Sequence, residues 1–204
     1  MNITGLETLV FGVENLADCA QYLTDYGLIA VDTNDQGGRF EALDGTAIVL
    51  AHTDDETLPA ALGNGCLLRK TVMGVANQAS LDGIRDELSK DRAVRLLDDG
   101  SIESVDDMGF VIGFQLTQRK LIEKIGEIAN VPGSPIQRDV NQLGVDDHVG
   151  QIRPRTLSHV VYFVPDVVKA EAFYVERLGF RCTDRFDGIG PFLQASGSLE
   201  HHSH

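Results

Sequence analysis

The stretch Arg153-Pro-Arg-Thr-Leu-Ser-His159-Val-Val-Tyr-Phe-Val-Pro-Asp166 decides the fold of this chain. It places one histidine at the head of an apolar run, and the run leads directly into a segment with helical spacing. Because alternate residues of a strand share a face, His159 is expected on one face with Leu157, Val161 and Phe163. The other face then carries Val160, Tyr162 and Val164. One face should line a cavity and the other should hold the helix.

The same pattern of a strand, a helix and further short strands occurs in three copies. In the first copy, residues 6–13 are a predicted strand, Asn15 is a predicted helix N-cap, and the helix from residue 16 stops at Gly27. Strands follow at 28–32, 39–43 and 46–50, the last two joined by an Asp44-Gly45 turn. The second copy has a strand at 67–75, a helix at 80–88 and strands at 93–97 and 110–116. The third has a strand at 157–164, a helix at 167–178, a stop at Gly179, and strands at 180–186 and 191–195. Aligning the copies places Asn15, Asn77 and Asp166 at equivalent strand-to-helix junctions.

The bulk composition excludes several classes of function. The chain has 204 residues and a formal net charge of -14, without a cluster of lysine and arginine, so a nucleic-acid partner is not expected. Its three scattered cysteines favour reduced thiols. No apolar run approaches the ~20 residues of a membrane helix, and no basic leader is present, so we predict a soluble cytoplasmic protein without a membrane partner. The acidic pairs at 98–99 and 106–107 are expected to be solvated turns.

The spacing of the copies predicts two domains. Residues 1–118 form an N-terminal domain of two modules, residues 119–156 form a linker, and residues 157–204 are the third module and the start of a second domain. The linker contains a short amphipathic segment at 121–129 and the sequence Pro132-Gly-Ser-Pro135, in which proline fixes the backbone and removes a hydrogen-bond donor.

This βαβββ repeat resembles the vicinal oxygen chelate superfamily, which includes glyoxalase I, bleomycin-resistance proteins and extradiol ring-cleaving dioxygenases. The order of two modules, a linker with Pro and Arg, and then Leu-Ser-His159-Val-Val-Tyr-Phe-Val-Pro-Asp166 is most similar to the two-domain extradiol dioxygenases. The resemblance implies an α+β fold of repeated βαβββ modules, of which three are visible here. It also implies an enzyme that opens a catecholic ring with O₂ at a non-haem Fe(II) centre, as a homo-oligomer.

Three residues take roles from this resemblance. His159 corresponds to the first iron ligand, and His202, in His201-His202-Ser203, corresponds to an active-site acid/base. Phe192 resembles an aromatic residue that walls the substrate pocket. A 2-His-1-carboxylate set suits this chemistry because it leaves coordination positions open for catecholate and O₂, and histidine titrates near neutrality. The repeat supports the assignment of His159. Its equivalent positions in the first two copies are Thr8 and Lys70, so neither copy carries a metal ligand there, as in the metal-free first domain of the family.

The chain departs from the family in its ligand set. In the family, a second histidine ligand opens the fourth module and a glutamate lies near its end, both beyond His204, so the chain is expected to be a portion of a longer protein. The alternative function is a metal-free module that sequesters a small aromatic molecule, as bleomycin-resistance proteins do. A glyoxalase-like isomerisation would need the same missing ligands. The tail, residues 197–204, also resembles an expression scar of the Leu-Glu-polyhistidine type, which competes with its assignment as a native return strand.

Overall fold

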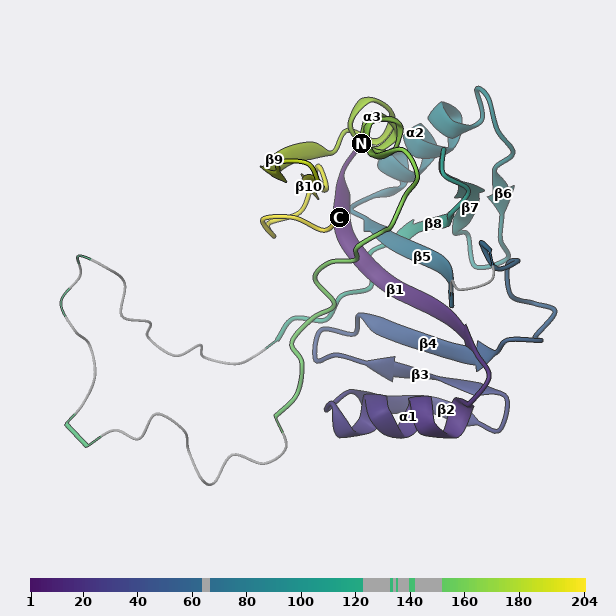
Figure 1. Cartoon of the computed structure of the whole chain (residues 1–204), viewed down its shortest axis with the longest axis vertical. Helices are drawn as coiled ribbons and strands as arrows, with labels where there is room; N and C mark the ends of the chain where they lie inside the picture. Colours follow the sequence, from purple (N-terminus) through teal and green to yellow (C-terminus); the bar gives the residue numbers. More distant parts are fainter. Residues whose placement is uncertain (64–66, 123–132, 134, 136–139, 142–151) are drawn as a thin grey trace.

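The computed structural model describes residues 1–63, 67–122, 133, 135, 140–141 and 152–204. Its main element is an eight-stranded sheet with the strand order β2-β3-β4-β1-β5-β8-β7-β6, and a separate two-stranded sheet pairs β9 with β10 (Figure 1). The fold is therefore mixed α+β and dominated by sheet, as predicted. The predicted segment 121–129 lies largely outside the described residues.

The elements follow the three copies of the sequence pattern. The first copy contains β1 (Ile3–Val13), α1 (Leu16–Asp25), β2 (Ile29–Asn34), β3 (Gly37–Glu41) and β4 (Ala47–His52). The second contains β5 (Leu68–Val75), α2 (Gln78–Leu88), β6 (Arg95–Leu96), β7 (Ile102–Val105) and β8 (Val111–Leu116). The third contains α3 (Val167–Ala172), the π-helical turn η1 (Phe173–Arg177), β9 (Arg181–Phe186) and β10 (Gly190–Gln194).

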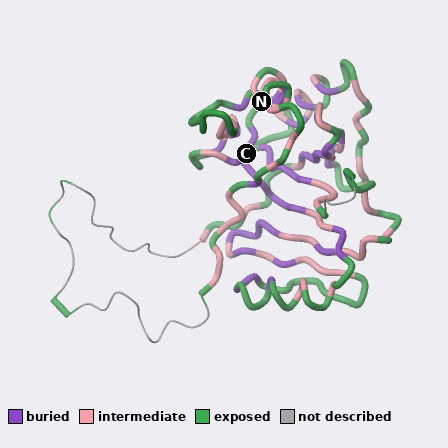
Figure 2. Tube along the Cα trace, in the orientation of Figure 1, coloured by how far each residue is buried: buried purple, intermediate pink, exposed green. Residues whose placement is uncertain are grey.

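The sheet has the symmetry that a repeat predicts. β1 and β5, the first strands of the two copies, pair antiparallel at its centre. β1 pairs in parallel with β4, and β5 pairs in parallel with β8. Farther out, β4 pairs antiparallel with β3, and β8 pairs antiparallel with β7. Figure 2 shows that the buried residues gather along β1 and the strands beside it. Each copy therefore contributes one half of the sheet, and the two halves meet at β1 and β5.

Equivalent caps begin the three helices. The side chain of Asn15 accepts a hydrogen bond from the backbone N of Asp18 at 3.2 Å, and Asn77 accepts one from Ser80 N at 2.9 Å. Asp166 likewise accepts from Lys169 N at 3.0 Å. Each cap satisfies an N–H that has no partner within the first helical turn. The predicted alignment of Asn15, Asn77 and Asp166 at the starts of three helices is therefore confirmed.

Glycines end two of the helical segments in the left-handed region. Gly27 follows α1 with φ 102° and Gly179 follows η1 with φ 76°, a conformation that side chains with a Cβ rarely adopt. At Gly27 a Cβ would also lie 2.4 Å from the carbonyl oxygen of Ile152. Both predicted helix stops are confirmed, and at Gly27 the glycine also admits the close approach of the segment before His159.

Three predictions are corrected. Residues 157–164 form no strand, because their backbone joins no ladder: Leu157 N donates to Thr46 Oγ1 and Val160 N donates to Ser203 O. The second copy has an additional strand, β7, whose short polar sequence gave no alternating signal. Asp106 is 5% exposed rather than solvated, because α3 and η1 cover the turn that carries it.

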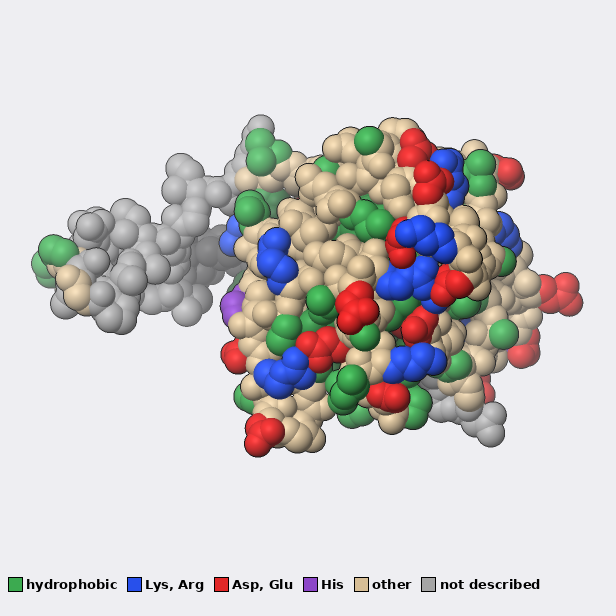
Figure 3. Space-filling model, turned by 90° about the horizontal axis from the view of Figure 1, so that it is seen from above, with side chains coloured by type: hydrophobic (Ala, Val, Ile, Leu, Met, Phe, Trp, Pro, Cys, Tyr) green, Lys and Arg blue, Asp and Glu red, His purple; other side chains and the backbone are tan. Residues whose placement is uncertain are grey.

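The third copy packs on the eight-stranded sheet, hereafter the first sheet, and the two share one continuous hydrophobic core. The buried cluster that contains Ile3, Leu6 and Phe114 also contains Phe173, Leu178 and Leu193. Polar contacts add to it near the N-terminus, where Gly197 N donates to Ile3 O at 2.8 Å and Ser196 Oγ donates to Met1 O at 2.7 Å. On the face seen from above, basic and acidic side chains lie next to one another rather than in areas of one sign (Figure 3). None of the helices in the described part of the chain has the length and apolar composition needed to cross a membrane.

Candidate functional site

A pocket of about 410 Å³ brings together His159, His202 and Phe192, the three residues that the sequence singled out. The segment 159–164 forms one side, α3 with Tyr174 forms a second, and β10 with the tail forms a third. Apart from Glu171 and the histidines, most of the lining side chains are apolar. A pocket of this size, with apolar walls and a few convergent polar groups, is suited to a small organic ligand.

The segment 159–164 shows the alternation expected of a strand although it forms no ladder. Val160 is 9% exposed and packs on the core, whereas Val161 and Phe163 are 69% and 94% exposed. His159 lies on the same outward face. The hydroxyl of Ser158 lies 3.3 Å from Nδ1 of His159, which leaves Nε2 as the nitrogen that can bind a ligand. His159 is thus an accessible imidazole on the pocket wall.

His202 lies against His159, with 5.0 Å between the ring centroids. The backbone of the adjacent Ser203 and His204 pairs with Leu193 of β10, and Ser203 O accepts from Val160 N. The tail therefore lies between β10 and the segment of His159. Burial lowers the pKa of His202 below its ordinary value, and the neighbouring His159 and His201 lower it further. At neutral pH the ring is neutral and can accept a proton.

Phe192 stands across the pocket from His159 on β10. Its ring meets His202 edge to face with centroids 4.8 Å apart, and it meets Phe186 in the same way at 5.1 Å. Edge-to-face contacts of this kind fix the orientation of an aromatic side chain. Two phenyl rings and one imidazole thus line this side of the pocket.

Sequence reasoning missed the inner wall of the pocket. Tyr162, Tyr174 and His204 line it, and the ring of His204 contacts both tyrosines, with centroids 5.3 Å and 4.7 Å away. Burial lowers the pKa of His204 to about 3, so its imidazole is neutral at neutral pH. Tyr162 belongs to the apolar run, and Tyr174 lies in the helix predicted at 167–178. No local signal distinguishes them from ordinary core residues.

The described residues do not complete a metal site by themselves. A site that holds Fe(II) and leaves positions open needs two imidazoles and a carboxylate on one face. The described part of the chain contains no group of three His, Cys, Asp or Glu residues that could hold a metal ion. His159 supplies one accessible nitrogen, and the donors that would join it are not among the residues described.

Comparison with known proteins finds a family match for the third copy and similar folds for the chain. The fold is that of the vicinal oxygen chelate proteins, and residues 156–203 match the profile of the Glyoxalase/Bleomycin resistance protein/Dioxygenase superfamily. Metapyrocatechase 2 of Cupriavidus necator is 41% identical over 58 residues, which are 28% of this chain and 18% of that protein. These matches confirm the resemblance inferred from the segment of His159.

Solved structures of low identity share the fold. A halotolerant catechol dioxygenase has a TM-score of 0.67 at 15% identity, and a catechol 2,3-dioxygenase has 0.63 at 20%. The Mn(II)-bound glyoxalase of Novosphingobium aromaticivorans has 0.63 at 16%. They cover 99%, 99% and 94% of this chain, whereas the chain spans 64%, 65% and 58% of their lengths. The similarity concerns architecture, and this chain is shorter than these relatives.

Proposed function

We propose that this chain carries the ring-binding side of an extradiol-type dioxygenase that opens a catecholic ring with O₂ at a non-haem Fe(II) centre. The observation that carries the proposal is the convergence of His159, His202 and Phe192 on one apolar pocket. Each comes from a different segment of the third copy, so only the folded chain places them together. The catechol dioxygenases of the same fold support the assignment.

His159 would be one ligand of the metal, through the nitrogen that Ser158 leaves accessible. Bound Fe(II) would supply adjacent open positions for the catecholate oxygens and O₂. The proposal requires two further donors that the described residues do not provide. We therefore assign to this chain one metal ligand, together with the groups that bind the ring and move its protons.

His202 would take a proton from a catechol hydroxyl and return it to the product. Its lowered pKa keeps the ring unprotonated at neutral pH, as a base requires. Its contacts with His159 and Phe192 support this role, because they put the imidazole beside the proposed metal ligand and the aromatic wall.

A second candidate is a metal-free module that sequesters a small aromatic molecule. The specific observation in its favour is that the described residues contain no set of three metal-binding side chains. The same pocket, with the same aromatic walls, would serve this function without His159 as a ligand. The two candidates differ in whether O₂ is consumed and in whether His159 matters for metal affinity.

An oxygen-uptake experiment decides between them. The full-length protein, which must include the two further donors that the proposal requires, is loaded anaerobically with Fe(II) and mixed with a panel of catechols, and O₂ consumption and ring-opened products are followed. His159→Ala is compared with His52→Ala, in which the substituted histidine lies at the end of β4, away from the pocket. We expect uptake with wild type and His52→Ala, and loss of both uptake and iron retention with His159→Ala. Catechol binding by calorimetry without uptake in any sample would instead support the sequestering module.

A further inference from the structure

The inner wall of the pocket consists of two tyrosines that are bonded to the first sheet. The hydroxyl of Tyr162 donates to Thr71 Oγ1 of β5 at 2.5 Å, and the hydroxyl of Tyr174 donates to Asp106 Oδ2 at 3.0 Å. Thr71 and Asp106 are 1% and 5% exposed. Both rings line the pocket with His159 and His202. The lining residues of this pocket all come from the third copy, and the second copy holds two of them through Thr71 and Asp106.

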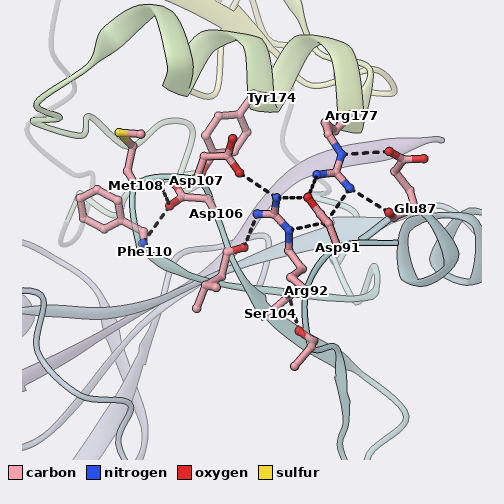
Figure 4. Close-up of polar contacts among 12 residues, drawn as sticks. Glu87, Asp91, Arg92, Ser104, Asp106, Asp107, Met108, Phe110, Tyr174 and Arg177 are labelled. Carbon is pink, nitrogen blue, oxygen red and sulfur yellow. Dashed lines mark hydrogen bonds and ion pairs between the residues drawn. The ribbon is translucent and has the colours of Figure 1, made fainter. Parts of the chain in front are cut away.

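The turn that contains Asp106 orients its carboxylate toward the Tyr174 hydroxyl. Its Oδ1 accepts from the backbone N of Met108 and of Phe110, both at 2.9 Å. With Oδ1 occupied in this way, the carboxylate has a fixed orientation and Oδ2 faces Tyr174, which projects from the helical segment above it (Figure 4). Burial raises the pKa of Asp106, while the turn amides and the Tyr174 hydroxyl oppose that change.

The same turn also supports the other tyrosine. Phe110, whose N–H is bonded to Asp106, stacks on Tyr162 with centroids 4.4 Å apart and rings within 10° of parallel. Asp106 therefore acts on both tyrosines, directly on Tyr174 and through Phe110 on Tyr162. Removing its carboxylate changes two adjacent parts of the pocket wall at once.

Ion pairs hold the helical segment over this turn. Arg177 of η1 contacts Glu87 at 2.9 Å and Asp91 at 2.7 Å (Figure 4). The guanidinium of Arg92 lies 4.9 Å from the ring centroid of Phe173 and pairs with Asp107 at 2.7 Å. The position of the segment along α2 is thus set by contacts outside the pocket. Within that arrangement, the bond to Asp106 fixes the tip of Tyr174.

We propose that Asp106 is a positioning residue for the pocket. It fixes the rings of Tyr174 and Tyr162 as a rigid inner wall against which an aromatic ligand is seated. The inference rests on the proposed function in one respect, namely that the ligand of this pocket is an aromatic ring. It adds that the first two modules help to determine how that ring binds. They do so although their residues equivalent to His159, Thr8 and Lys70, are not ligand residues.

The chain offers a matched control. Asp44 is also a buried carboxylate, 6% exposed, in the equivalent turn between β3 and β4 of the first copy, and its Oδ1 accepts from Thr46 N and Oγ1. Its Oδ2 lies 3.8 Å from the guanidinium of Arg119, which belongs to the linker and not to the pocket. Asp106→Asn and Asp44→Asn thus remove the same charge from equivalent turns, and only the first touches the pocket wall. Tyr174→Phe removes the tether while keeping the ring and the turn, in case Asp106→Asn does not fold.

Two measurements test the proposal on the full chain. Tyrosine labelled with ¹³C at Cζ gives four signals, because the chain contains four tyrosines, and the signal that Tyr174→Phe removes is that of Tyr174. We expect Asp106→Asn to shift this signal and Asp44→Asn to leave it in place. Catechol binding by calorimetry under argon should weaken about fivefold in Asp106→Asn and in Tyr174→Phe, the effect of one net hydrogen bond. The double variant should be no weaker than either single one.

The outcomes separate this proposal from the proposed function. An unmoved Tyr174 signal in Asp106→Asn, or equal catechol affinities in Asp106→Asn and Asp44→Asn, would overturn the positioning role even if the enzyme is active. If iron-loaded wild type turns over catechol, KM should rise in Asp106→Asn while kcat stays within about twofold, since the tether acts on binding. If wild type binds catechol but consumes no O₂, the dioxygenase assignment fails, and the NMR and binding results still decide the role of Asp106.

Discussion

The buried imidazole of His204 makes the stability of this protein sensitive to mild acid. Both ring nitrogens are buried, and neither has a hydrogen-bond partner among the residues that the structure describes. The ring is packed among Tyr162, Tyr174 and Phe180. Burial lowers its pKa from 6.5 to about 3, because an apolar site disfavours the charged form.

The direction and size of the effect follow from linkage. Below pH 6.5 the unfolded chain binds a proton on this imidazole, whereas the folded chain does not until the pH approaches 3. Lowering the pH therefore favours the unfolded state, and the stability present above pH 6.5 is lost between 6.5 and 3. The slope is about 1.4 kcal/mol per pH unit, so this one group removes about 2 kcal/mol between pH 7 and pH 5.

The perturbation is His204→Leu, compared with His52→Leu outside the pocket. Urea unfolding followed by far-ultraviolet circular dichroism at pH 7 and pH 5 gives the free energy of unfolding of each protein. We expect wild type and His52→Leu to lose about 2 kcal/mol more than His204→Leu between these pH values. Equal losses in all three proteins would refute the reasoning, because they would show that His204 is protonated in the folded state or is not buried there.

Three further predictions test the fold. Phe114→Ala, at a side chain that is 0% exposed, should cost about 3–5 kcal/mol in chemical unfolding, whereas Phe163→Ala, at one that is 94% exposed, should cost less than about 0.5 kcal/mol; equal costs would contradict the burial of Phe114. Asn77→Ala removes the N-cap of α2 and should cost about 1 kcal/mol, and an unchanged unfolding midpoint would show that this cap is not formed. Arg177→Met should lower the urea midpoint more at low salt than in 1 M NaCl, because ion pairs at the surface are screened; a shift independent of salt would point to lost packing instead.

Local signals in the sequence predicted the helices of this fold well. Asn15, Asn77 and Asp166 cap their helices as the aligned copies indicated, because a cap depends on residues three positions apart. Gly27 and Gly179 end them for an equally local reason. Pairing between segments was harder to predict from the sequence. Residues 157–164 have the alternation of a strand, but a ladder needs a partner from elsewhere in the chain.

The burial of residues where one copy packs on another could not be predicted from the sequence either. Asp106 belongs to an acidic pair in a turn, a pattern typical of solvated residues, and only the packing of α3 and η1 over it makes it part of a pocket wall. Tyr174 has the spacing of a core residue, and its hydroxyl acquires a role from a carboxylate that lies far away in sequence. Residues that act between copies leave no signal within any one copy.

Comparison of His159 with its two equivalent positions shows how a repeated pattern acquires a site in only one copy. Thr8 lies in the paired strand β1, is 5% exposed and accepts from Arg39 at 3.4 Å. Lys70 lies in the paired strand β5 and contacts Glu103 at 3.1 Å. Both side chains are thus engaged within the sheet. His159 lies in a segment that no ladder covers, with its ring accessible on a pocket wall. The site therefore depends on two differences at once: the imidazole of His159, and a backbone that pairs with no strand among the described residues. A Thr8→His substitution alone would bury the new imidazole in β1 and would not create a second site.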